Sequence, residues 1–205
     1  MINPEIGPVG PHGGAGTGVA EARRASPLQA RILRRAITVG LGAIVVAVAA
    51  QVVVPVPFSP VPMTLQPLAV LAVGGLVGAA GGLSALVLYL LLGILGLPVF
   101  AGGGSGAWHL LGPTGGYLLA FPVAAGVTGA LVAHAPHSVF RVLLACALGM
   151  LIIHVGGVAQ LALLGGDPAL AFRVGFVPFL TGDLVKVGLA AALILAAGSK
   201  IRSSL

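Results

Sequence analysis

Six apolar stretches occupy most of the chain, and shorter segments rich in glycine, proline or polar residues separate them. An α-helix needs about 20 apolar residues to cross a hydrocarbon core roughly 30 Å thick. The stretches therefore predict six transmembrane helices and an all-α, polytopic membrane protein. Their predicted bounds are residues 36–54, 64–80, 83–97, 115–133, 139–164 and 176–197.

The connecting segments differ in length and composition. Several prolines in residues 55–62 interrupt any helix there and predict an extended connector. Residues 98–114 form a glycine-rich loop, whereas Gly81 and Gly82 predict only a tight turn. Thr64 is the expected N-cap of the second helix.

The charge distribution supports a membrane location. Hydrophobic residues make up 58% of the chain and charged residues only 7%, far below the roughly 25% charged residues of an average soluble domain. No Asp, Glu, Lys or Arg occurs between Arg35 and Arg141. This composition excludes a water-soluble fold, a disordered chain and a nucleic-acid-binding module, so the excess of basic residues does not indicate a nucleic-acid partner.

The few basic residues indicate the orientation in the membrane. With six helices both termini lie on one side, and the arginines before residue 36 join Arg141, Lys200 and Arg202 there. Only Arg173 falls in a loop on the opposite side. The positive-inside rule then predicts a multi-pass protein of the cytoplasmic membrane with both termini inside.

Two parts of the chain are expected. Residues 1–35, rich in glycine, proline and arginine, predict a disordered, basic cytoplasmic tail. Residues 36–200 form the six-helix transmembrane domain. The proline-rich connector and the glycine-rich loop then both face outward, where they are expected to roof a cavity.

Asp183 and Lys186 are the main candidates for a functional site. Ionisable groups inside a membrane are costly, and residues three apart share one helix face. The alternative interpretation is a buried ion pair with a purely structural role. As a ligand site, the pair offers acceptors on the carboxylate and donors on the ammonium group.

Other polar residues within the spans have two interpretations each. His154 is either a packing residue or a ligand-binding one, and no second His, Cys or carboxylate is spaced to join it in a metal site. Gln66 either bonds to a neighbouring helix or lines a pocket. Tyr89 and Tyr117 fit interfacial positions, and Trp108 fits a lid over an apolar ligand.

A serine-based enzyme is a rival hypothesis from a different class. Ser105 lies between glycines in the loop, and His154 is the available base. The resulting alternative is an intramembrane serine protease, although Ser105 does not lie at a strand–turn–helix elbow or a helix start. The same glycine run is not a phosphate-binding loop, because no Lys-Ser/Thr pair follows it.

Four motifs occur in order along the chain. They are VPFSPVPMTLQ at residues 56–66, LYLLLGILGLPVF at 88–100, GPTGGYL at 112–118 and GDLVK at 182–186. Together they resemble the BioY family, the biotin-specific S components of energy-coupling-factor (ECF) vitamin transporters. The resemblance runs from about residue 36 to 197, and Ala120 stands where the family more often has glycine.

The resemblance implies a substrate-binding subunit that captures biotin from outside for uptake across the membrane, without catalysis or a cofactor. A transmembrane coupling subunit and ATPase subunits are the implied partners. The chain has no Walker motif, so ATP is used only by those subunits. Asp183 is expected to accept from the ureido N–H groups of biotin, and Lys186 to donate to the ureido oxygen.

The complete set of residues expected to contact the substrate is Asp183, Lys186, Gln66, Tyr89, Gly116, Tyr117 and His154. For the substrate carboxylate, we expect backbone N–H groups of the glycine-rich loop, with Arg173 as a further candidate for steering the anion. No catalytic residue and no metal ligand is expected. The alternatives within the same class are an S component for another vitamin and a solitary carrier.

Small residues on the first helix are the expected contact with the coupling subunit. Family members have an Ala-x-x-x-Ala pattern there, and Ala43 with Ala47 matches that spacing best. Ala36 with Gly40 is the alternative pair. Such spacing lets two helices approach closely.

Overall fold

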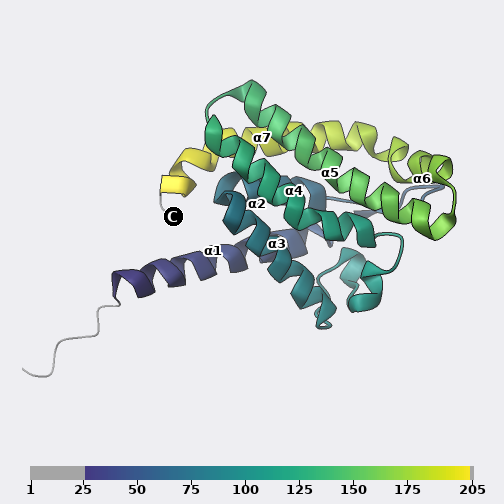
Figure 1. Cartoon of the computed structure of the whole chain (residues 1–205), viewed down its shortest axis with the longest axis horizontal. Coiled ribbons are helices and arrows are strands. Elements are labelled where there is room, and N and C mark those ends of the chain that lie inside the picture. The colour runs from purple at the N-terminus through teal and green to yellow at the C-terminus, as the bar shows by residue number, and fades with distance from the viewer. Residues whose placement is uncertain (1–25, 204–205) are drawn as a thin grey trace, which may run out of the picture.

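The computed structural model describes residues 26–203, and most of this part of the chain is α-helical (Figure 1). The helices are α1 (Pro27–Ala49), α2 (Gln66–Val77), α3 (Ala79–Ile94), α4 (Gly115–His134), α5 (Val139–Gly165), α6 (Pro168–Gly175) and α7 (Leu180–Ser203). The shorter elements are the strands β1 (Val53–Val54) and β2 (Met63–Thr64) and the 3₁₀ turns η1 (Ala101–Gly103), η2 (Ala107–Leu110) and η3 (Val177–Phe179).

Each of the six predicted stretches contains a helix, so the prediction of a mainly helical membrane protein is confirmed. Helices α1, α4 and α5 are long and apolar enough to cross a membrane, and so is the stretch Pro168–Gly198, which joins α6, η3 and most of α7. Helices α2 and α3 are shorter apolar helices. The short amphipathic helix α6 and the turn η3 precede α7 and were not predicted. Asp167 caps α6 by accepting hydrogen bonds from two backbone N–H groups, which explains this extra helix start.

Helix α1 begins nine residues before the predicted start at residue 36. Ser26 and Gln29 form a capping box, in which each side chain accepts a hydrogen bond from the other residue's backbone N–H. Pro27 occupies the first turn, where its missing N–H costs nothing. The predicted disordered tail is therefore wrong for residues 27–35, and residues 1–25 of that tail lie outside the described residues.

The junction between α2 and α3 lies at Gly78 rather than at Gly81 and Gly82. Gly78 has a φ of +88°, which glycine adopts without the steric cost that a Cβ imposes. Gly81 and Gly82 lie inside α3. Thr64 is also not the N-cap of α2, because Leu65 occupies that position. The Thr64 hydroxyl accepts a hydrogen bond from the backbone N–H of Gln66 instead.

The irregular segments gather at one end of the helix bundle. Figure 1 shows the two strands, α6 and the loop between α3 and α4 at this end, whereas the start of α1, the α4–α5 turn and the end of α7 lie at the other. The strands pair antiparallel, with Val53 opposite Thr64 and Val54 opposite Met63. The proline-rich connector is therefore a hairpin that folds beside the glycine-rich loop.

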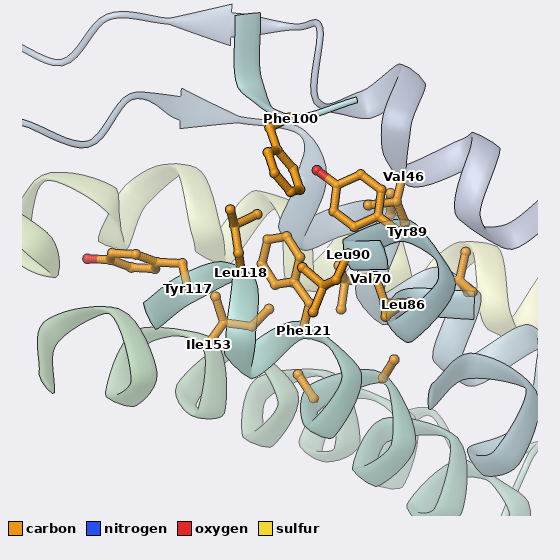
Figure 2. Close-up of a cluster of buried hydrophobic side chains, with 14 of the residues drawn as sticks. Val46, Val70, Leu86, Tyr89, Leu90, Phe100, Tyr117, Leu118, Phe121 and Ile153 are labelled. Atoms are coloured by element: carbon orange, nitrogen blue, oxygen red, sulfur yellow. The ribbon is translucent and has the colours of Figure 1, made fainter. Parts of the chain in front are cut away.

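Glycines permit the close helix crossing that places α4 against α5. A Cβ on Gly116 would collide with the backbone oxygen of Gly156, and a Cβ on Gly156 would collide with the backbone of Gly116. The hydrophobic core nearby includes Tyr89 and Phe121, with Phe100 reaching in from the loop (Figure 2). This packing fixes the positions of α4 and α5 relative to each other.

Candidate functional site

A cavity of about 200 Å³ lies at the end of the bundle that carries the irregular segments. Its walls come from the β-hairpin, α2, the loop before α4, and helices α4, α5 and α7. This volume far exceeds the roughly 10–15 Å³ of cavity space that one water molecule needs. The lining residues are Val61, Pro62, Met63, Thr64, Gln66, Pro67, Phe100, Ala101, His109, Thr114, Tyr117, Leu118, Phe121, Ile153, His154, Phe179, Asp183 and Lys186.

Three ionisable side chains form a connected group on one wall, which we call the ionic triad: His154, Asp183 and Lys186. One carboxylate oxygen of Asp183 accepts from the Lys186 Nζ at 2.9 Å, and the other lies 2.5 Å from the His154 Nε2. All three residues are at most 6% exposed. Because the Asp183 carboxylate accepts, His154 donates from Nε2.

The ionic triad has hydrogen-bonding capacity that the protein does not use. An ammonium group has three donors, and Lys186 directs one of them to Asp183. The Nδ1 of His154 is buried without a hydrogen-bond partner in the described part of the chain. Each carboxylate oxygen of Asp183 has a second lone pair. Since buried polar groups are costly when unpaired, the free positions beside the cavity suit a polar ligand.

Aromatic rings hold the imidazole of His154 in place. The ring of Phe176 lies edge-on at a centroid distance of 4.9 Å, and that of Tyr117 lies edge-on at 6.0 Å. Phe179 is tilted at 6.1 Å. Tyr117 is itself fixed, because its hydroxyl donates to the backbone oxygen of Gly175 at 2.6 Å. These contacts restrict the direction from which His154 meets Asp183.

A second polar group, which we call the neutral network, consists of Thr64, Gln66 and Tyr89. The Gln66 amide accepts from the Thr64 hydroxyl at 3.1 Å and donates to the Tyr89 hydroxyl at 2.6 Å. Tyr89 donates in turn to the backbone oxygen of Val99 at 3.1 Å. The network therefore ties β2, α2 and α3 to the start of the glycine-rich loop.

Further side chains anchor the loop that roofs the cavity. Gln160 on α5 donates to the backbone oxygens of Leu110 and Gly112, at 2.8 and 2.7 Å. Gln51, just after α1, donates to the backbone oxygen of Phe100 at 3.3 Å. The loop is thus attached to the ends of two helices and to the neutral network.

The structure brings five of the seven predicted substrate-contact residues to the cavity: Asp183, Lys186, His154, Gln66 and Tyr117. Tyr89 is fully buried behind Gln66 and does not line the cavity. Gly116 also lies off the lining, since it forms the α4–α5 crossing. Motif membership alone did not separate these two residues, which position the site, from those that line it.

Several lining residues were not predicted from the sequence. The aromatic walls include Phe100, Phe121 and Phe179, and His109 lines the cavity where Trp108 was expected as a lid. Trp108 is 70% exposed, and its indole N–H donates to the backbone oxygen of Ser105. The signal for Phe100 was present, because it closes the second motif, but an isolated His109 in a loop carries no pattern.

The geometry does not support the protease hypothesis. The Nε2 of His154, which would act as the base, faces Asp183 and not a serine. Ser105 is absent from the lining of the cavity that holds His154. Within residues 26–203, no cluster of His, Cys, Asp and Glu fits a metal ion either.

The expected coupling residues on α1 differ in burial. Ala43 is 1% exposed and belongs to the core, and Ala47 packs against that core. Ala36 is exposed, and a Cβ on Gly40 would meet open space. Ala43 is therefore corrected as a partner contact, because it packs α1 on its own bundle. Ala47 is only partly buried, and its contact with the coupling subunit stays a prediction.

Comparisons with known proteins agree on one family. The family model described as "BioY family" matches residues 21–203. The chain is 39% identical over 163 residues to a "Biotin transporter BioY" of Thermotoga maritima, covering 80% of this chain and 95% of that one. It is also 39% identical over 150 residues to a "Probable biotin transporter BioY" of Pyrococcus horikoshii, covering 73% and 86%.

A solved structure supports the same relationship. The crystal structure of "the S-component for biotin from an ECF-type ABC transporter" superposes with a TM-score of 0.76 at 25% sequence identity, covering 82% of this chain and 92% of that chain. The family match spans all of the described residues and includes every residue of the ionic triad. The chain belongs to the BioY family.

Proposed function

We propose that this protein is the biotin-binding S component of an ECF-type transporter, and that it captures biotin for uptake across the cytoplasmic membrane. The observation that carries the proposal is the ionic triad, whose unused donors and acceptors lie beside a cavity in an otherwise uncharged part of the bundle. The family and the names of the relatives support biotin as the ligand. The protein binds its ligand without chemical change and is not an enzyme.

The cavity suits the two chemical faces of the biotin ring system. The ureido head has two N–H donors and one carbonyl acceptor, which match the lone pairs of Asp183 and the remaining donors of Lys186. Phe121, Ile153 and Phe179 offer apolar walls to the thioether ring and the aliphatic chain. Both charged residues then serve one end of the ligand, because residues three apart lie only about 5–6 Å apart.

The proposed orientation places the cavity toward the outside. The starts of α1 and α5 lie at the end opposite the irregular segments (Figure 1). Arg31 and Arg35 belong to the first part of α1, and Arg141 to the first turn of α5. The positive-inside rule assigns this end to the cytoplasm. In this six-span arrangement the shorter helices α2 and α3 also cross the membrane, in addition to the four longer spans. Membrane lipid covers the many exposed apolar side chains of the outer helix faces.

Uptake requires partners that supply energy. The sequence has no ATP-binding motif, so a coupling subunit in the membrane and ATPase subunits are the proposed partners. Ala36, which is exposed, and Gly40, which is half-buried but has open space where a Cβ would lie, form the proposed contact with the coupling subunit. Small residues at this spacing let a partner helix approach closely.

Isothermal titration of the detergent-solubilised protein tests the ligand assignment. We expect biotin to bind with high affinity, and thiamine and riboflavin not to bind. Biotin sulfone, altered in the thioether ring, is expected to bind more weakly because that ring fills the apolar wall. Binding of thiamine or riboflavin without biotin binding would assign the protein to another vitamin and refute the proposal.

Copurification with the coupling subunit tests the partner assignment separately. Ala36→Trp and Gly40→Trp are expected to lower the amount of coupling subunit that copurifies while biotin binding stays intact. Leu193→Trp is the matched control, because this exposed residue lies on α7. If all three variants copurify as much coupling subunit as the unmodified protein does, the α1 contact is rejected.

A further inference from the structure

The carboxylate of the proposed ligand has no assigned partner in the ionic triad. Lys186 and His154 already bond to Asp183, and the anion of Asp183 repels a second carboxylate placed beside it. The ureido head of biotin, which is uncharged, suits this end of the cavity better. A cation or strong donor elsewhere in the lining is needed for the carboxylate.

Backbone groups of the glycine-rich loop, which the sequence suggested for this role, are largely committed. Their N–H groups bond to other backbone oxygens of the protein, and three of those oxygens lie within the loop itself. The N–H groups that are engaged in this way belong to Phe100, Gly102, Gly103, Gly104 and Gly106. The loop is held in shape by these bonds, and a side chain is the better source of a donor. Arg173, the other candidate, is exposed on α6 and does not line the cavity.

His109 is the remaining lining residue that can carry a positive charge. It lies on η2, apart from the α5 and α7 positions of the ionic triad. The buried Nδ1 atom has no hydrogen-bond partner among the described residues. A buried polar atom without a partner is rare enough in proteins to require an explanation, and an absent ligand is one.

The surroundings of His109 keep the imidazole at the cavity. Its ring packs against Phe100 at a centroid distance of 5.6 Å and edge-on against Trp108 at 5.4 Å. Gly104 provides the space for the ring, because a Cβ there would collide with the His109 Nε2. The loop therefore supports a histidine at the roof, while Asp183 and Lys186 lie in the wall formed by α7.

We propose that His109 binds the carboxylate of the substrate and selects for ligands that carry this anion at the end opposite the ureido head. This inference rests on the proposed function, since it takes biotin as the ligand. A charge-assisted hydrogen bond between imidazolium and carboxylate is stronger than a neutral one. The ionic triad then binds the ureido head of the ligand, and His109 binds the carboxylate at its other end.

Paired titrations with biotin and biotinamide test the assignment, because the amide removes only the charge of the tail. We expect the unmodified protein to prefer biotin. His109→Ala should lower biotin affinity about tenfold or more and leave biotinamide affinity nearly unchanged, so the preference disappears. His109→Gln, which keeps a donor but loses the charge, should fall between the two. His137→Ala, at the opposite end of the bundle, is the matched control and should behave as the unmodified protein.

The outcomes separate this inference from the proposed function. Equal losses for biotin and biotinamide in His109→Ala and His109→Gln would mean that His109 only packs the loop, and would overturn the assignment. An unchanged preference for biotin would overturn it as well, while leaving biotin capture intact. If the unmodified protein binds neither ligand, the proposed function fails first and the assignment fails with it.

Discussion

The ionic triad and the neutral network are the two buried polar groups beside the cavity, and they differ in how completely they are paired. In the neutral network each hydroxyl and the Gln66 amide have protein partners, and the chain of bonds ends on a backbone oxygen. In the ionic triad, donors of Lys186 and the Nδ1 of His154 have no partner within the described residues. A complete network supports structure, whereas an incomplete one beside a cavity is suited to a ligand.

This difference explains the positions of the two groups. The neutral network links β2, α2 and α3 to the loop, so it holds the roof against the bundle. The ionic triad joins α5 to α7 and presents its free groups at the cavity wall. The buried charges, which are costly in a membrane protein, therefore lie at the cavity, where their free donors and acceptors can bind a ligand.

The largest effect is expected from Asp183→Asn. The amide keeps the size of the side chain but loses the charge that both Lys186 and His154 require, and breaking a buried pair of this kind costs roughly 3–5 kcal/mol. Biotin affinity should fall by a factor of about 100 or more, as measured by isothermal titration. Asp167→Asn, in the exposed cap of α6, is the matched control and should bind biotin normally. Retained high affinity in Asp183→Asn would mean that the ionic triad has only a structural role and does not bind the ligand.

The second prediction separates stability from binding. Lys186→Met alone should lower the thermal unfolding temperature, because Asp183 then remains buried without its cationic partner. The double variant Asp183→Asn/Lys186→Met should be more stable than Lys186→Met alone, because no carboxylate is then buried without its cationic partner. Biotin affinity should stay as low as in Asp183→Asn. Recovery of affinity in the double variant would mean that the charges of the ionic triad are not needed for ligand binding.

A smaller effect is expected at His154. His154→Phe keeps an aromatic ring among Tyr117, Phe176 and Phe179 but removes the donor to Asp183, so biotin affinity should fall about tenfold. His154→Gln retains a donor and should lose less than His154→Phe. A smaller loss in His154→Phe than in His154→Gln would mean that His154 acts through the packing of its ring, and not by orienting the carboxylate.

The sequence predicted the helical, membrane-spanning fold because apolar stretches of span length have few other solutions. It predicted less well where two local signals compete. Gly81 and Gly82 read as a turn, but only Gly78 has the positive φ that breaks the helix. Ala43 and Gly40 are both small, and only three-dimensional packing shows that one is buried and the other meets open space.

For the candidate site, charge was the stronger signal. Asp183 and Lys186 stood out because charged residues are rare in the spans, and the structure places both at the cavity. Gln66 also lines it, but its partner Tyr89 lies behind it, and sequence spacing does not encode that difference. His109 was missed because a single loop residue reaches the cavity only through the folded course of the whole loop.

The smallest effect on binding is expected from Tyr89→Phe, which removes one hydroxyl from the neutral network. Gln66 and the Val99 carbonyl each lose a partner, which should lower the free energy of unfolding by about 1 kcal/mol. Biotin affinity should change by less than about threefold, because Tyr89 supports the roof without lining the cavity. Thr128→Val is the matched control, since it removes a fully buried hydroxyl that donates to the Ala145 carbonyl away from the cavity. Suppose that both variants lose similar stability but Tyr89→Phe loses clearly more biotin affinity than Thr128→Val. The neutral network would then contribute to ligand binding, and the division between a structural and a binding group would fail.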